Sequence, residues 1–155
     1  MSKSAGNVVD PKTVLDKYGA EPFRLWAAVE GNLERTDFRC SFDRIDGAGK
    51  TISKLWNVCR FVSMFEQAKK PKKLEALDEW ILNEAAKLVS LANERYARYD
   101  LHNPSIAIKH FLWEPFASHY MEMVKNRAYA GDASARYTLH TVLQTLLKLL
   151  APVLP

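Results

Sequence analysis

The feature that most limits the fold of this chain is an apolar side chain at every third or fourth position, a pattern that recurs after residue 41. In the first such stretch, residues 42–67, the apolar positions are Ile52, Leu55, Trp56, Cys59, Val62 and Phe65. This spacing places them on one side of an α-helix, where they can be buried together. The stretch therefore predicts a long amphipathic helix, and the lysine-rich residues 69–73 that follow predict an exposed linker.

Three more stretches with the same spacing predict three more helices. The second helix begins at Leu77. Asn103 is expected to cap the third helix and Gly131 to end it, and the fourth helix begins near Asp132. Pro115 lies inside the third helix, so a kink is expected there, because proline has no backbone N–H to donate. Four amphipathic helices with short connections favour an all-α fold, an antiparallel bundle.

The residues before this pattern contain more turn-forming residues and shorter apolar runs. Asp10 followed by Pro11 predicts the N-cap and the first residue of a short helix, which Gly19 ends. A second short helix is expected over residues 22–30. The start of the chain is therefore predicted to connect something else to the bundle.

Composition is consistent with one globular domain and a short appendage. The chain has 155 residues, of which 48% are hydrophobic and 26% charged, enough to bury a core without disulfides. We divide it into a connecting segment, residues 1–41, and a helical bundle, residues 42–155, which we expect to be truncated at its C-terminal end. The net charge of +4 favours an anionic partner, though only weakly.

Several kinds of site and location are not expected. Cys40 and Cys59 form no CxxC pair, and the four histidines lack metal-ligand spacing, so no metal site is predicted. The N-terminus has no secretory signal, and the apolar tail over residues 142–154 is interrupted and too short to span a bilayer. These features indicate a cytoplasmic protein without a membrane partner.

The first residues, Ser2-Lys3-Ser4 followed by Gly6, have side chains suited to holding a triphosphate. An ammonium neutralises phosphate charge, hydroxyls donate hydrogen bonds, and glycine lets the backbone approach closely. Ser-Lys-Ser is a common tripeptide, however, and taken alone it is better explained by a solvated terminal loop.

The longer stretch favours the nucleotide. Residues 1–11 (MSKSAGNVVDP) and 17–26 (KYGAEPFRLW) resemble the KMSKS signature of class I aminoacyl-tRNA synthetases and the segment after it. The resemblance implies that Lys3 is catalytic and holds the phosphates of ATP while the amino-acid adenylate forms. It also implies that Ser2 and Ser4 shape this ATP-binding loop. The first lysine of the signature would precede the chain, so we expect the chain to be part of a longer protein.

Three later stretches indicate which amino acid is attached. Residues 54–62 (KLWNVCRFV) are similar to the KLWNxxRFV pattern of valyl-tRNA synthetases, and residues 36–41 and 111–127 are similar to further valyl segments. Isoleucyl-tRNA synthetases are the alternative, although their comparable helix usually lacks the tryptophan. The resemblance implies that the bundle is an anticodon-binding domain and that the whole protein joins valine to tRNA(Val) with ATP and Mg²⁺. The chain alone is expected to be inactive and monomeric.

The first long helix carries four candidate tRNA-binding residues at near-helical spacing, away from its apolar stripe: Lys50, Lys54, Asn57 and Arg60. Such a row can follow phosphates, although a solvated polar face is the commoner explanation of a charge row. Trp56 and Phe61 could stack on a base, but their spacing favours the core.

Three further basic residues are candidates for tRNA binding. By the resemblance, Arg24 lies in a region that touches the inner side of the tRNA, and a structural salt bridge is the competing explanation. Lys125 and Arg127 lie near a helix C-terminus, where cations are stabilising in any case, and Glu122 can pair with Lys125 or Asn126.

Two other classes of protein fit the same residues. One is a free-standing helical RNA-binding protein, and the other is a helical protein-interaction module whose basic face serves solubility. Steep loss of tRNA affinity with rising salt distinguishes an RNA-binding protein from a protein-interaction module.

Overall fold

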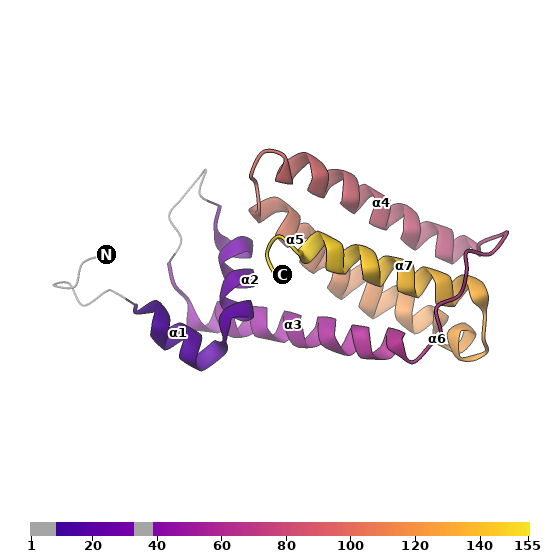
Figure 1. Cartoon of the computed structure of the whole chain (residues 1–155), viewed down its shortest axis with the longest axis horizontal. Helices are drawn as coiled ribbons and strands as arrows, with labels where there is room; N and C mark the ends of the chain where they lie inside the picture. The colour runs from indigo at the N-terminus through magenta and orange to yellow at the C-terminus, as the bar shows by residue number, and fades with distance from the viewer. Residues whose placement is uncertain (1–8, 33–38) are drawn as a thin grey trace.

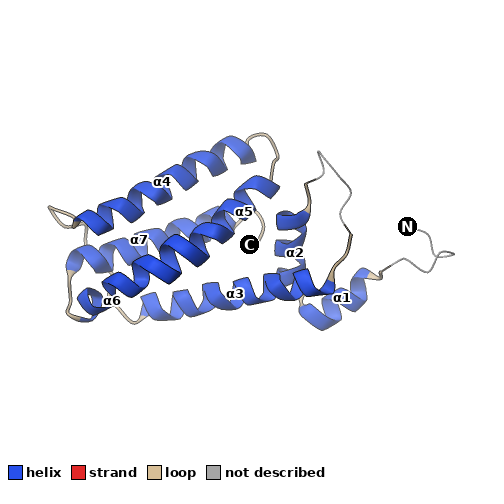
Figure 2. Ribbon diagram, turned by 180° about the vertical axis from the view of Figure 1, so that it is seen from behind, coloured by secondary structure: helices blue, strands red, loops and turns tan. Residues whose placement is uncertain are grey.

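The computed structural model describes residues 9–32 and 39–155, and every regular element in these ranges is a helix. In chain order the elements are α1 (Pro11–Tyr18), α2 (Ala20–Glu30), α3 (Phe42–Ser63), α4 (Ala76–Tyr96), α5 (His102–Phe111), the π-helical segment η2 (Leu112–Tyr120), α6 (Met121–Tyr129) and α7 (Ala133–Leu150). α3 and α4 run along opposite sides of the molecule, with α7 and the continuous run α5–η2–α6 between them (Figures 1 and 2). The predicted all-α bundle is confirmed.

The long helices share one apolar core. Val62 of α3, Ile81 of α4, Ile108 of α5, Phe116 of η2 and Leu139 of α7 are all completely buried in it. Burying a side chain of this size contributes about 1.5–3 kcal/mol, so the predicted stripes account for why the helices associate.

A second, smaller core joins α1 and α2 to the bundle. Val14, Leu25 and Trp26 are buried there with Ile45 at the start of α3 and Val153 in the C-terminal turn. Gly19 ends α1 with φ +83°, a conformation that costs glycine little, and its N–H donates to the carbonyl of Leu15. The described residues of the predicted connecting segment therefore pack against the start of α3 and against the C-terminal turn.

The structure confirms some predicted helix ends and corrects others. The Asp10 carboxylate accepts the Lys12 N–H at 2.9 Å and caps α1 as predicted. The predicted end of the first long helix at residue 67 is wrong, because α3 stops at Ser63. Asn103 is not the cap of the third helix: the carboxylate of Asp100 accepts the Asn103 N–H at 3.0 Å instead.

Pro115, where a kink is predicted, lies inside the π-helical segment η2, so the α-helical hydrogen-bond pattern is interrupted there. At the end of η2 the Met121 N–H donates to the carbonyl of Phe116, five positions earlier. The hydroxyl of Ser118 donates to the Trp113 carbonyl at 2.7 Å. The wider turn gives the proline ring room beside the preceding carbonyls, so the helical path runs on from α5 into α6.

Candidate nucleic-acid interface

α3 has one buried side and one exposed side. Taking roughly 100° per residue, its buried residues Ile45, Val58 and Val62 lie on one side, and the opposite arc spans roughly 160°. From Lys50 onward, the polar or exposed residues of this arc form what we call the α3 face: Lys50, Ser53, Lys54, Trp56, Asn57, Arg60 and Met64. The four candidate residues predicted on this helix therefore share one surface.

The α3 face is positively charged beyond its first turn. No acidic residue occurs in the chain between Asp46 and Glu66. The ammonium of Lys50 donates to the carboxylate of Asp46 at 2.9 Å, and this hydrogen bond together with the negative charge of Asp46 raises the pKa of Lys50. Within the described ranges, Asn57 and Arg60 have no side-chain hydrogen bond or ion pair. Arg60 can therefore bind an anion without first breaking an internal pair.

Lys54 is held by an aromatic ring. Its ammonium lies 5.4 Å from the centre of the Trp113 ring, which η2 supplies. The indole N–H of Trp113 donates to the hydroxyl of Thr51 at 3.2 Å, one turn before Lys54 on the same helix. Sequence spacing gave no signal for the contact, because Thr51 and Trp113 are 62 positions apart.

Trp56 corrects the prediction that it is buried in the core. Its side chain is 67% exposed at the edge of the α3 face, beside Asn57. Phe61 is half-buried and packs edge-on against Phe65 and Tyr129, with ring centres 5.2 and 6.4 Å apart. Trp56 is therefore an aromatic surface free to stack on a base, whereas Phe61 serves packing.

The other three candidate cations have internal partners. Arg24 donates from Nε to the carbonyl of Val153 at 2.9 Å and fastens α2 to the C-terminal turn. Lys125 pairs with Glu122, one of the two pairings predicted for Glu122, and both side chains are substantially exposed. Arg127 is 29% exposed and binds Asp78 at 2.8 Å and Asp132 at 3.0 Å. None of the three lies on the α3 face.

The Arg127 pairs belong to a buried polar cluster centred on Asp78, at the start of α4. The carboxylate of Asp78 is completely buried and accepts from Tyr120, Ser134 and Arg127 at 2.5–3.2 Å. The hydrogen bond from Arg127 to Asp78 raises the pKa of Arg127. The pKa of Tyr120 is raised mainly by burial and secondly by its hydrogen bond to Asp78. The cluster ties α4 to η2, α6 and α7 and so serves the fold.

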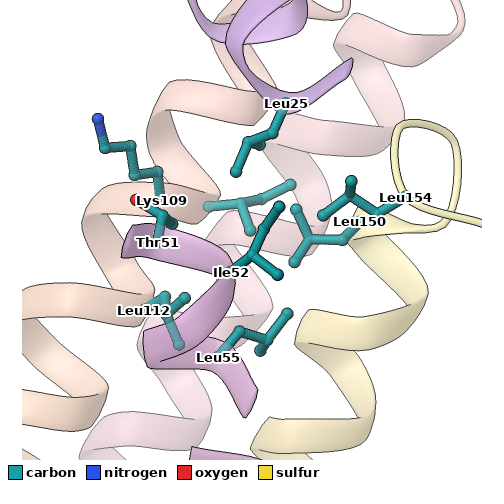
Figure 3. Close-up of a pocket in the computed structure, with 9 residues that line it drawn as sticks. Leu25, Thr51, Ile52, Leu55, Lys109, Leu112, Leu150 and Leu154 are labelled. Atoms are coloured by element: carbon teal, nitrogen blue, oxygen red, sulfur yellow. The ribbon is translucent and has the colours of Figure 1, made fainter. Parts of the chain in front are cut away.

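Ser2, Lys3 and Ser4 lie outside the described residues. In residues 9–32 and 39–155 no cluster of histidine, cysteine or acidic side chains could hold a metal ion, and no helix there is long and apolar enough to cross a membrane. A void of about 10 Å³, lined largely by leucines of α2, α3, η2 and α7, is too small for a ligand (Figure 3).

Two family models and several relatives match this chain. Residues 78–155 match the family model described as the anticodon-binding domain of tRNA ligase, and residues 1–39 match that of class I tRNA synthetases (I, L, M and V). A valine–tRNA ligase of Pyrobaculum aerophilum is 36% identical over 100% of this chain and 20% of its own length. That of Clostridium perfringens is 37% identical over 100% of the chain and 19% of its length.

The chain thus spans about a fifth of the length of these relatives. The anticodon-binding model covers half of the chain, including α4 through α7. The remaining long helix, α3, packs into the same core. The chain therefore belongs to the anticodon-binding domain family of class I tRNA ligases.

Proposed function

We propose that this chain is the tRNA-binding part of a valine–tRNA ligase and that the α3 face contacts the tRNA backbone. The observation that carries the proposal is the row of cations on this face. Among the described residues, Arg60 has no ion-pair partner and Lys54 is held by an aromatic ring without a carboxylate. Cations without carboxylate partners supply the salt-dependent, sequence-independent part of nucleic-acid affinity. Lys50 and Asn57 extend the row, and Trp56 adds a surface for base stacking.

The same proposal covers the whole protein. In this proposal the whole protein joins valine to tRNA(Val) with ATP and Mg²⁺, acts in the cytoplasm, and is a monomer. Lys3 holds the ATP phosphates during adenylate formation, with Ser2 and Ser4 in the same loop. This chain by itself binds tRNA but does not form the adenylate.

Removing single cations tests the proposed interface. We expect Arg60→Met to weaken binding of a fluorescent tRNA(Val) transcript roughly two- to tenfold, the range for one hydrogen-bonded contact. Lys87→Met is the matched control, since Lys87 is an exposed cation of α4, on the opposite side of the bundle (Figure 1). Equal effects of the two substitutions in fluorescence anisotropy would contradict the proposed placement.

The amino-acid identity and the ATP site need separate tests. For identity, tRNA(Val) and tRNA(Ile) are compared with their anticodons exchanged, and preference should follow the valine anticodon. Equal affinity for both removes the support of this domain for the valyl assignment against the isoleucyl one. For the ATP site, Lys3→Ala in the full-length protein should slow adenylate formation and leave tRNA affinity unchanged. An unchanged activation rate rejects the role of Lys3.

A further inference from the structure

We infer that Trp113 is a positioning residue for tRNA binding, because it holds the Lys54 ammonium at a fixed place on the α3 face. The inference rests on the proposed function and adds a residue of η2, outside α3, to the interface. Trp113 need not touch the tRNA, since it acts through Lys54.

Two consecutive hydrogen bonds, which we call the relay, connect the Trp113 ring to the backbone of α3 through Thr51. Its indole N–H donates to the Thr51 hydroxyl at 3.2 Å, and that hydroxyl donates to the carbonyl of Gly47 at 3.2 Å. Thr51 is only 4% exposed, so water competes little for either bond. A hydroxyl has one donor and can accept at the same time, and both capacities are used here. The relay sets the plane of the ring relative to α3.

The ring restrains Lys54 without neutralising it. At 5.4 Å from the ring centre, the ammonium is within the range of a cation–π contact. Lys50 and Lys87 are instead held by the carboxylates of Asp46 and Glu84, which cancel their charge locally. A phosphate must displace a carboxylate to use either of those lysines, whereas the aromatic face leaves the full charge of Lys54 available. Holding a long side chain in place also lowers the entropy lost when it is immobilised on binding.

A double-mutant cycle in this chain tests the inference. Trp113→Leu removes the aromatic face, Lys54→Met removes the charge but keeps the stem, and the two are combined. We expect Trp113→Leu to weaken tRNA(Val) binding roughly two- to fivefold in the wild-type background and to have no further effect in the Lys54→Met background. Trp113→Phe keeps an aromatic face and should lose less affinity than Trp113→Leu.

Two controls separate positioning from general damage to the fold. Trp80→Leu removes a half-exposed tryptophan of α4, the helix that lies across the bundle from α3 (Figure 1), and should leave tRNA affinity unchanged. Thermal unfolding of each variant checks that binding is measured on folded protein. If Trp113→Leu is unfolded at the assay temperature, Thr51→Val replaces it in the cycle, because it removes the acceptor of the indole N–H.

The outcomes distinguish the inference from the proposed function. The positioning role is rejected, and the α3 interface stands, in either of two cases. In the first, Trp113→Leu weakens tRNA binding equally in the wild-type and Lys54→Met backgrounds. In the second, Lys54→Met weakens tRNA binding but Trp113→Leu does not. If Lys54→Met and Arg60→Met both leave tRNA affinity unchanged, the proposed interface itself is rejected. The inference is supported if Trp113→Leu lowers tRNA affinity only when Lys54 is present and Trp113→Phe lowers it less.

Discussion

Replacing Asp78 by alanine should be among the most damaging single changes in this chain. Asp78 is completely buried at the first turn of α4 and binds Arg127 with both carboxylate oxygens, at 3.2 and 2.8 Å. Its removal leaves a guanidinium without its bidentate partner and the buried Tyr120 hydroxyl without its acceptor. Breaking a buried ion pair by removing one partner costs about 3–5 kcal/mol. Because Arg127 is 29% exposed and keeps Asp132, we expect the lower end, about 3 kcal/mol.

Urea unfolding followed by circular dichroism measures this free energy. Glu84→Ala is the matched control, because Glu84 is also an acid of α4 but pairs with Lys87 at the surface. The control should change the unfolding free energy by less than about 1 kcal/mol. A loss below about 1 kcal/mol for Asp78→Ala would refute the assignment of the cluster as a structural tie between α4, α6 and α7.

Single substitutions at Asp132, Trp56 and Arg24 test three further points. Burial opposes the charge of Asp132, but its bonds to the Ala135 N–H and to Arg127 outweigh burial and lower its pKa below 3.8. The stabilisation by the charged Asp132 is therefore complete above pH 3.8 and is lost as the pH falls through the lowered pKa. In Asp132→Asn, the free energy of unfolding should fall less steeply with pH below about pH 4 than in the wild type. Trp56→Leu should leave the melting temperature unchanged, because the side chain is 67% exposed. It should weaken tRNA binding in the anisotropy assay, because it removes the surface proposed for base stacking. Arg24→Met should lower the unfolding free energy by about 1–3 kcal/mol through loss of its bond to Val153, with tRNA affinity of the folded variant unchanged.

The bundle could be predicted from the sequence because burial of one helix side imposes a local spacing. Ile81, Ile108 and Leu139 occur at the positions that this spacing requires, and all three are completely buried. The same rule failed at Trp56. This residue lies at the edge of the apolar arc, where spacing alone does not say whether a neighbouring helix covers the side chain.

The roles of the cations could not be predicted, since they depend on partners distant in the sequence. Arg127 meets Asp78 across 49 positions, and Arg24 meets Val153 across 129. Lys54 and Arg60 look equivalent to Arg127 in the sequence, yet neither has a carboxylate partner among the described residues. Sequence spacing could therefore place four candidates on one side of α3, but it had no means of separating free cations from cations with internal partners.

Lysine footprinting by acylation and mass spectrometry, with and without tRNA(Val), tests the proposed interface most directly. We expect bound tRNA to slow acylation of Lys50 and Lys54 on the α3 face and to leave the acylation rate of Lys87 on α4 unchanged. Lys50 and Lys87 are matched, because both are more than 70% exposed and both pair with an acid of their own helix. Equal protection of Lys50 and Lys87, or protection of Lys87 alone, would contradict it.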